Sequence, residues 1–92
     1  MVYTIADFRR DIRQPYAWPG GYPRFFIASD GEALSFAAAR ENVRTILDSI
    51  HNRHSDGWRI VGCEINWEDA ELFCSHTNKR IESAYAEPEE EG

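Results

Sequence analysis

The chain has 92 residues and a formal net charge of −6, and 42% of its residues are hydrophobic. This length suits one small domain with a single core, and the hydrophobic content excludes an extensively disordered chain. The longest apolar runs, such as residues 25–28, have four residues. A membrane span or a signal-peptide core needs a much longer run, so we expect a soluble, cytoplasmic protein.

The first element that the pattern predicts is a helix over residues 4–13. Thr4 can cap its N-terminus, and Asp7 stands where a capping box needs an acceptor side chain. The apolar residues Ile5, Phe8 and Ile12 recur at helical spacing and form one stripe. Three basic side chains point largely away from this stripe: Arg9, Arg10 and Arg13.

Residues 15–23 hold three prolines, two glycines and three aromatic residues, a composition typical of an ordered loop. Tyr16, Trp18 and Tyr22 are too many large rings for so small a core to bury. One interpretation is that they cover the end of a sheet. The other is that some of them anchor a partner, because Trp and Tyr are prominent among the residues that dominate interfaces.

The remaining elements predict an α+β domain over residues 1–86. We expect a hairpin (24–28 and 32–35), a helix capped by Ser35 and running to residue 51, a long strand (58–67) and a last hairpin (72–75 and 79–82). In the long strand, Val61, Cys63, Ile65 and Trp67 share one face. The order α-β-β-α-β-β indicates an antiparallel sheet of four to five strands with two helices. Residues 87–92 read as an acidic, disordered tail.

Cysteine and histidine residues suggest a metal site only weakly. Structural zinc sites show paired ligands at short spacing, and no such cysteine pair is present. A disulfide is also disfavoured in a reducing compartment. We therefore expect no metal, no cofactor and, since no catalytic motif is visible, no enzymatic activity. The residues concerned are His51, His54, Cys63, Cys74 and His76.

Charge is unevenly distributed along the chain. Residues 1–53 hold seven Arg and six acidic residues, whereas residues 54–92 hold three basic and ten acidic residues. An acidic protein is a poor binder of free DNA but suits a basic protein surface. The bend that follows the long strand places three carboxylates beside an indole, and it is either a solvated turn or a partner-binding site: Trp67, Glu68, Asp69 and Glu71.

Three stretches, residues 15–26 (PYAWPGGYPRFF), 57–74 (GWRIVGCEINWEDAELFC) and 80–87 (RIESAYAE), carry a resemblance to a known group. Together with the length and the α+β order, they resemble the small phage-encoded type I-F anti-CRISPR proteins, which inhibit the Csy surveillance complex. The resemblance covers nearly the whole chain but includes no diagnostic catalytic motif.

The resemblance implies a non-enzymatic inhibitor in the bacterial host cytoplasm that binds the Cas–guide RNA complex and blocks target DNA. The acidic bend and the aromatic loop would then contact Cas proteins, and Arg9, Arg10 and Arg13 would contact guide RNA. Two alternatives remain open. One is a mobile-element interaction module, with or without a metal that stabilises it. The other is a DNA mimic, which the nine Arg residues disfavour because a mimic presents an acidic surface.

Overall fold

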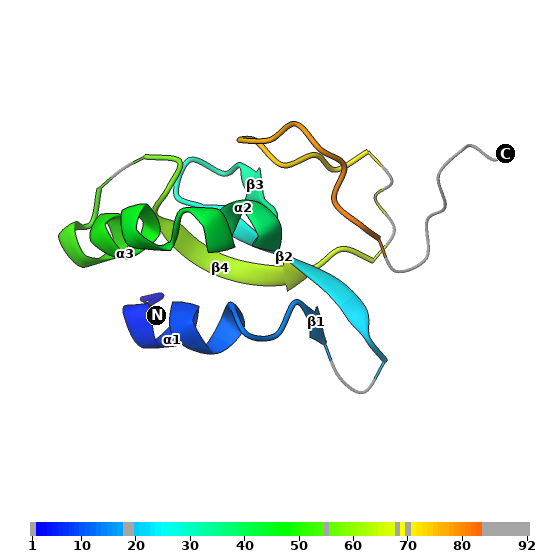
Figure 1. The fold of residues 1–92 in the computed structure, drawn as a ribbon, viewed down its shortest axis with the longest axis horizontal. Coiled ribbons are helices and arrows are strands. Elements are labelled where there is room, and N and C mark those ends of the chain that lie inside the picture. Colours follow the sequence, from blue (N-terminus) through cyan, green and yellow to red (C-terminus); the bar gives the residue numbers. More distant parts are fainter. Residues whose placement is uncertain (1, 18–19, 55, 68, 70, 84–92) are drawn as a thin grey trace, which may run out of the picture.

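The computed structural model describes residues 2–17, 20–54, 56–67, 69 and 71–83, and these form a small α+β domain (Figure 1). The predicted fold class is confirmed. Within the described residues there are three helices and four strands, in the order α1 (Ile5–Asp11), β1 (Tyr16–Ala17), β2 (Tyr22–Ala28), β3 (Ala33–Leu34), α2 (Phe36–Glu41), α3 (Val43–Asn52) and β4 (Ile60–Ile65).

Strand β2 is the centre of the sheet, and the other three strands pair with it in antiparallel fashion. The prediction of a loop over residues 15–23 was wrong in part, because Tyr16 pairs with Pro23 and Ala17 with Tyr22. The turn between these strands places Gly21 at a φ of 69°, a conformation that glycine adopts without steric cost. Residues 16–17 and 22–23 of the aromatic loop therefore extend the sheet.

Helix α1 begins where the sequence indicated. The Thr4 hydroxyl accepts a hydrogen bond from the Asp7 amide, and the Asp7 carboxylate accepts one from the Thr4 amide, which completes a capping box. The single helix expected over residues 36–51 is instead two helices that meet at Asn42. Asn42 leaves helical geometry (φ −129°, ψ 32°), and its Nδ2 donates to the carbonyl of Ala38, so the side chain competes with the helix hydrogen bonds.

A β-bulge changes which residues of β4 face the core. Phe26 pairs with Cys63 and Ile27 with Gly62, but Ala28 pairs with Ile60, so the register shifts by one residue. As a result Ile60 is buried, whereas Val61 is 42% exposed. The prediction that Val61 shares the apolar face of Cys63 and Ile65 was therefore wrong, since strict alternation holds only without a bulge.

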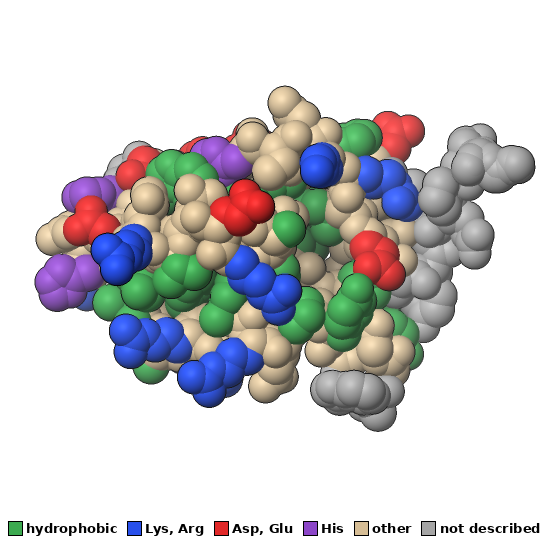
Figure 2. All heavy atoms as spheres, viewed as in Figure 1, with side chains coloured by type: hydrophobic (Ala, Val, Ile, Leu, Met, Phe, Trp, Pro, Cys, Tyr) green, Lys and Arg blue, Asp and Glu red, His purple; other side chains and the backbone are tan. Residues whose placement is uncertain are grey.

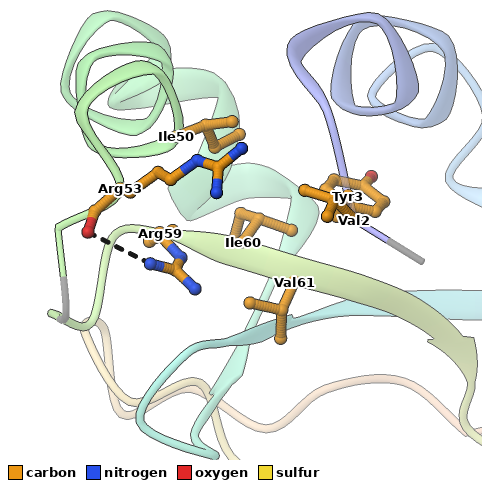
Figure 3. Close-up of a pocket in the computed structure, with 7 residues that line it drawn as sticks. All are labelled: Val2, Tyr3, Ile50, Arg53, Arg59, Ile60 and Val61. Atoms are coloured by element: carbon orange, nitrogen blue, oxygen red, sulfur yellow. Dashed lines mark hydrogen bonds between the residues drawn. The ribbon is translucent and has the colours of Figure 1, made fainter.

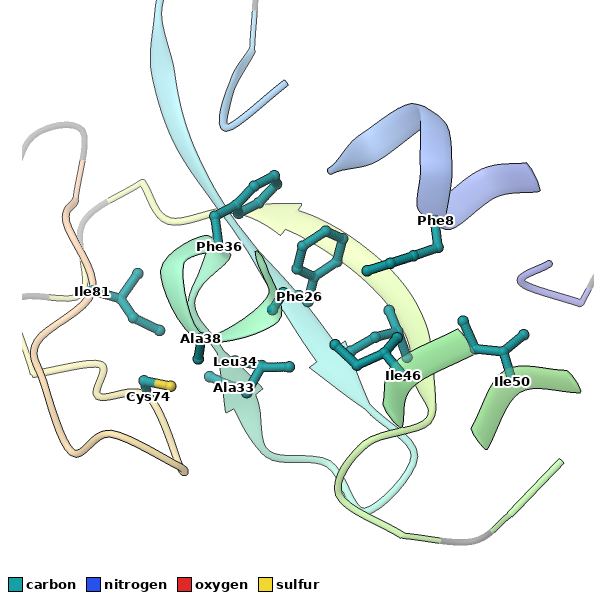
Figure 4. Close-up of a cluster of buried hydrophobic side chains, with 12 residues drawn as sticks. Phe8, Phe26, Ala33, Leu34, Phe36, Ala38, Ile46, Ile50, Cys74 and Ile81 are labelled. Atoms are coloured by element: carbon teal, nitrogen blue, oxygen red, sulfur yellow. The ribbon is translucent and has the colours of Figure 1, made fainter. Parts of the chain in front are cut away.

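The core lies on one face of the sheet, under the three helices (Figure 4). Phe26 of β2 stacks on Phe36 of α2, with ring centroids 4.3 Å apart, and packs against Phe8 of α1 at 5.3 Å. Ile46 of α3 and Leu34 of β3 are fully buried beside them. The ring contacts join α1 and α2 to the central strand, and α3 packs against β4 and the other two helices.

The last hairpin is present, although only one bridge, between Phe73 and Arg80, has regular strand geometry there. Its backbone bonds run from the Cys74 amide to the Lys79 carbonyl and from the Ile81 amide to the Leu72 carbonyl. The predicted acidic tail, residues 87–92, lies outside the described residues.

Candidate partner-binding surface

Two aromatic residues from distant parts of the sequence meet at the end of the sheet. The ring centroids of Tyr22 and Trp67 are 4.7 Å apart, with the rings tilted by 51°. The register explains this contact. Arg24 pairs with Ile65 in antiparallel strands, and Tyr22 lies two residues before Arg24 while Trp67 lies two residues after Ile65, so the two rings are cross-strand neighbours on the same face. The core does not extend this far, and Trp67 is 47% exposed.

The bend after Trp67 is held by Asn66, which the sequence analysis did not single out. Its side chain is almost fully buried, and its Nδ2 donates to the carbonyls of Asp69 and Glu82, both at 3.1 Å. Its Oδ1 accepts from the Asp69 amide at 3.2 Å. An asparagine that bonds to backbone a few residues ahead is typical of a turn, and that is the signal that could have identified it.

Acidic residues follow Trp67 in the sequence or are bonded to the same end of the sheet. Asp69 and Glu71 are exposed, and the Glu71 amide donates to Asp69 Oδ1, which fixes the aspartate. Tyr16 reaches across from β1, and its hydroxyl donates to Glu82 at 3.0 Å. This bond and the negative charge of Glu82 raise the pKa of Tyr16, so the phenol stays neutral.

We call these residues the aromatic–acidic corner: Tyr16, Tyr22, Trp67, Asp69, Glu71 and Glu82. The structure therefore brings together most of the partner-binding residues predicted from two separate segments, and it adds Glu82. Two further predicted residues, Trp18 and Glu68, lie outside the described residues.

Helix α1 ends at Asp11, before the predicted end at residue 13, so Arg13 follows the helix. It still lines one shallow groove with Arg9, Arg10, Ile5 and Ala6. Arg9 and Arg13 are exposed. Arg10 is also exposed but forms ion pairs with Asp7 and Asp11, both at 3.1 Å. Figure 2 shows further basic side chains, in blue, above α1 on the same face, interspersed with acidic ones in red.

The carboxylate of Asp11 is buried, and both of its oxygens accept hydrogen bonds. It accepts hydrogen bonds from the hydroxyl of Tyr3 at 2.7 Å and from the guanidinium groups of Arg10 and Arg24 at 3.1 Å. Burial opposes ionisation, but the hydrogen bonds outweigh it and lower the pKa of Asp11. The cluster ties α1 to β2 and has a structural role.

The cysteines and histidines do not form a metal site in the part of the chain that the structure describes: no three His, Cys, Asp or Glu residues there are grouped to hold an ion. Both cysteines are free. Cys63 is half-buried, and burial raises the pKa of its thiol to about 12. The ring of His76 stacks on that of Trp58, with centroids 3.8 Å apart.

Comparison with known proteins identifies no relative: no family model, curated protein or solved structure matches the chain. None of the described helices is long and apolar enough to cross a membrane.

Proposed function

We propose that this protein is a non-enzymatic inhibitor that binds the type I-F Cas–guide RNA surveillance complex, as a phage-encoded anti-CRISPR protein does, and blocks its access to target DNA. The observation that supports this proposal most is the contact between Tyr22 and Trp67. This contact brings the aromatic loop and the acidic bend, the two segments predicted to bind a partner, into one surface.

The chemistry of the aromatic–acidic corner suits a DNA-binding channel as its target. Such a channel holds nucleic acid with Lys and Arg side chains. Asp69 and Glu71 can pair with those cations and so compete with DNA phosphates, while the half-exposed indole of Trp67 supplies apolar contact area. Complementary charge of this kind speeds association and favours one partner over others.

The groove on α1 supports a second contact, with the phosphates of guide RNA. Because Arg10 is paired with Asp7 and Asp11, we assign this contact mainly to Arg9 and Arg13, which are exposed on the same groove. Arginine binds phosphate in a bidentate manner and does so even on a protein of negative net charge. Contact with RNA would explain why the first half of the chain is not acidic.

The experiment that tests the proposal is a gel-shift assay with purified type I-F surveillance complex and labelled target DNA. The protein is added either before or after the DNA. We expect loss of DNA binding only when the protein is added first, because both ligands then compete for the same channel. Co-elution with the complex in size-exclusion chromatography measures binding directly.

Charge reversal identifies the surface used. The double variant Asp69→Lys/Glu71→Lys should lose inhibition, whereas Glu32→Lys/Glu41→Lys, which changes the net charge equally at two other exposed sites, should keep it. A protein that neither co-elutes with the complex nor changes DNA binding is not an inhibitor of this class. Co-elution with undisturbed DNA binding would instead indicate a block of nuclease recruitment.

A further inference from the structure

A pocket lies at the other end of β4, where that strand begins. It has a volume of about 190 Å³ and opens between the end of α3, the start of β4 and the N-terminal segment (Figure 3). Its lining is polar and apolar in about equal parts. Two arginines reach into it from one side, Arg53 and Arg59, and the other lining residues are Val2, Tyr3, Ile50, Ile60 and Val61. None of these residues belongs to the aromatic–acidic corner.

The two guanidinium groups differ in how they are held. Arg59 is fixed, since its Nη1 donates to the carbonyls of Arg53 at 3.1 Å and His54 at 3.5 Å. Its other guanidinium nitrogens have no partner among the described residues, and neither has the guanidinium of Arg53. Five N–H donors on each group match oxyanions, so this pair has unused capacity for an anion.

The backbone at Arg53 is unusual for an arginine. It caps α3 in the left-handed conformation, at φ 55° and ψ 44°, where glycine or asparagine is the common choice. An arginine here adopts a strained backbone conformation, because its Cβ approaches the following carbonyl oxygen. This geometry directs the Arg53 carbonyl to Arg59, so one residue supplies both a guanidinium group and the contact that orients its neighbour.

Local charge also favours an anion. None of the described residues that line the pocket is acidic. Asp7 lies in the adjoining hollow, but its carboxylate is bonded to Thr4 and to Arg10 and is therefore compensated. An incoming anion meets two uncompensated positive charges.

Size and lining distinguish between kinds of anion. An inorganic phosphate would use the arginines but would leave the exposed apolar side chains of Val2 and Val61 without a partner. A carboxylate with a short branched aliphatic chain uses both, because its planar head matches a guanidinium fork and its chain removes apolar surface from water. We propose that this pocket binds an aliphatic carboxylate, either the C-terminus of a peptide with an aliphatic last residue or a free short-chain acid.

The test is a titration of the ¹⁵N-labelled protein followed by NMR, with isovalerate, the peptide acetyl-Gly-Gly-Leu, the same peptide as its C-terminal amide, and inorganic phosphate. Saturable shifts at Ile50, Ile60 and Val61 are expected with isovalerate or the free-acid peptide. The affinity for the amide should be at least tenfold lower. If the free-acid peptide binds more tightly than isovalerate, the natural ligand is the C-terminus of a chain. If isovalerate binds equally well or more tightly, the natural ligand is a free acid.

Variants connect the shifts to the arginines. Arg53→Asn, which tolerates the left-handed backbone, and Arg59→Gln should each weaken binding at least fivefold, while Arg44→Gln, exposed on α3 outside the pocket, should change it less than twofold. The proposal is overturned if neither ligand saturates, if phosphate or the amide binds as tightly, or if both pocket variants bind like the unaltered protein. The comparison of acid with amide needs no variant and stands even if Arg59→Gln does not fold.

Discussion

The ring of Trp67 packs against that of Tyr22 at the far end of the sheet, beyond the reach of the core. Each ring shields one side of the other, and 47% of Trp67 remains exposed. A rigid aromatic pair that is already in place loses little entropy on binding, so it is a suitable anchor for a partner. The hydrogen bond from Tyr16 to Glu82 places a carboxylate nearby.

Removing the indole should separate binding from stability. We expect Trp67→Ala to weaken binding to the surveillance complex about tenfold to thirtyfold, as loss of an aromatic anchor commonly does. Its melting temperature should change little, because the side chain lies outside the core. Phe73→Ala is the matched control, since Phe73 is 49% exposed and lies in the last hairpin. Equal affinity of the two variants, measured by biolayer interferometry, would contradict the assignment of the anchor.

Asn66 should matter to the same surface without touching the partner. The side chain of Asn66 is nearly buried, and Asn66→Ala removes its hydrogen bonds with the Asp69 amide and with the carbonyls of Asp69 and Glu82. Asn66 Nδ2 also donates to the carbonyl of the buried Ile81 at 3.4 Å. The expected cost is about 1–3 kcal/mol in the free energy of unfolding, because this buried carbonyl and the partly buried groups lose their partner. Affinity for the complex should fall as well, since the bend that carries Asp69 is no longer fixed.

Chemical denaturation gives the first quantity and interferometry the second. Asn52→Ala is the control: its side chain bonds only to Asp48, on the exposed side of α3. If Asn66→Ala lowers neither stability nor affinity, the bend is held by other contacts.

Local rules predicted much of this fold. Thr4 and Ser35 mark the starts of helices because a side-chain cap acts within one turn of chain, and both caps are present. The helical spacing of Ile5, Phe8 and Ile12 predicted one apolar stripe, and in the structure Phe8 lies in the core with Ile5 and Ile12 packed against it.

The features that the sequence did not predict depend on contacts between residues that are distant in the chain. The bulge at Ile60 and Val61 exists only relative to Ala28 of another strand, so alternation within β4 could not reveal it. For the same reason, Tyr22 and Trp67 were identified separately as candidates, and only the register of β2 with β4 joins them. The pocket at Arg53 and Arg59 was missed because it forms between three segments and has no motif of its own.

The bulge predicts opposite outcomes for two neighbouring positions. Ile60→Ala should destabilise the protein by about 2–5 kcal/mol, because it leaves a cavity at a fully buried site. Val61→Ala should cost about 0.5 kcal/mol or less, because Val61 is half-exposed. Urea denaturation monitored by circular dichroism measures both. Strict alternation would give the reverse order, with the larger loss at Val61.

Asp11 makes stability depend on pH in a specific direction. Its folded-state pKa is lowered because Arg10, Tyr3 and Arg24 donate hydrogen bonds to the carboxylate and outweigh its burial. A group with a lowered folded pKa stabilises the fold above its unfolded pKa, about 3.9 for Asp, and this contribution is lost as the pH falls through the folded value. The loss therefore begins near pH 5 and grows towards pH 3.

Asp11→Asn removes this titration. At pH 7 we expect the free energy of unfolding of the variant to be about 1–3 kcal/mol lower. Most of this loss comes from the bond with Arg24, whose side chain is 16% exposed, because solvent screens the charge of Arg10, which is 60% exposed. At pH 3 the difference from the unaltered protein should be much smaller. Asp48→Asn, on the exposed side of α3, should show no such convergence. A difference that stays constant from pH 7 to pH 3 would mean that the charge of Asp11 contributes nothing, and that only the shape of its hydrogen-bonded network holds α1 to β2.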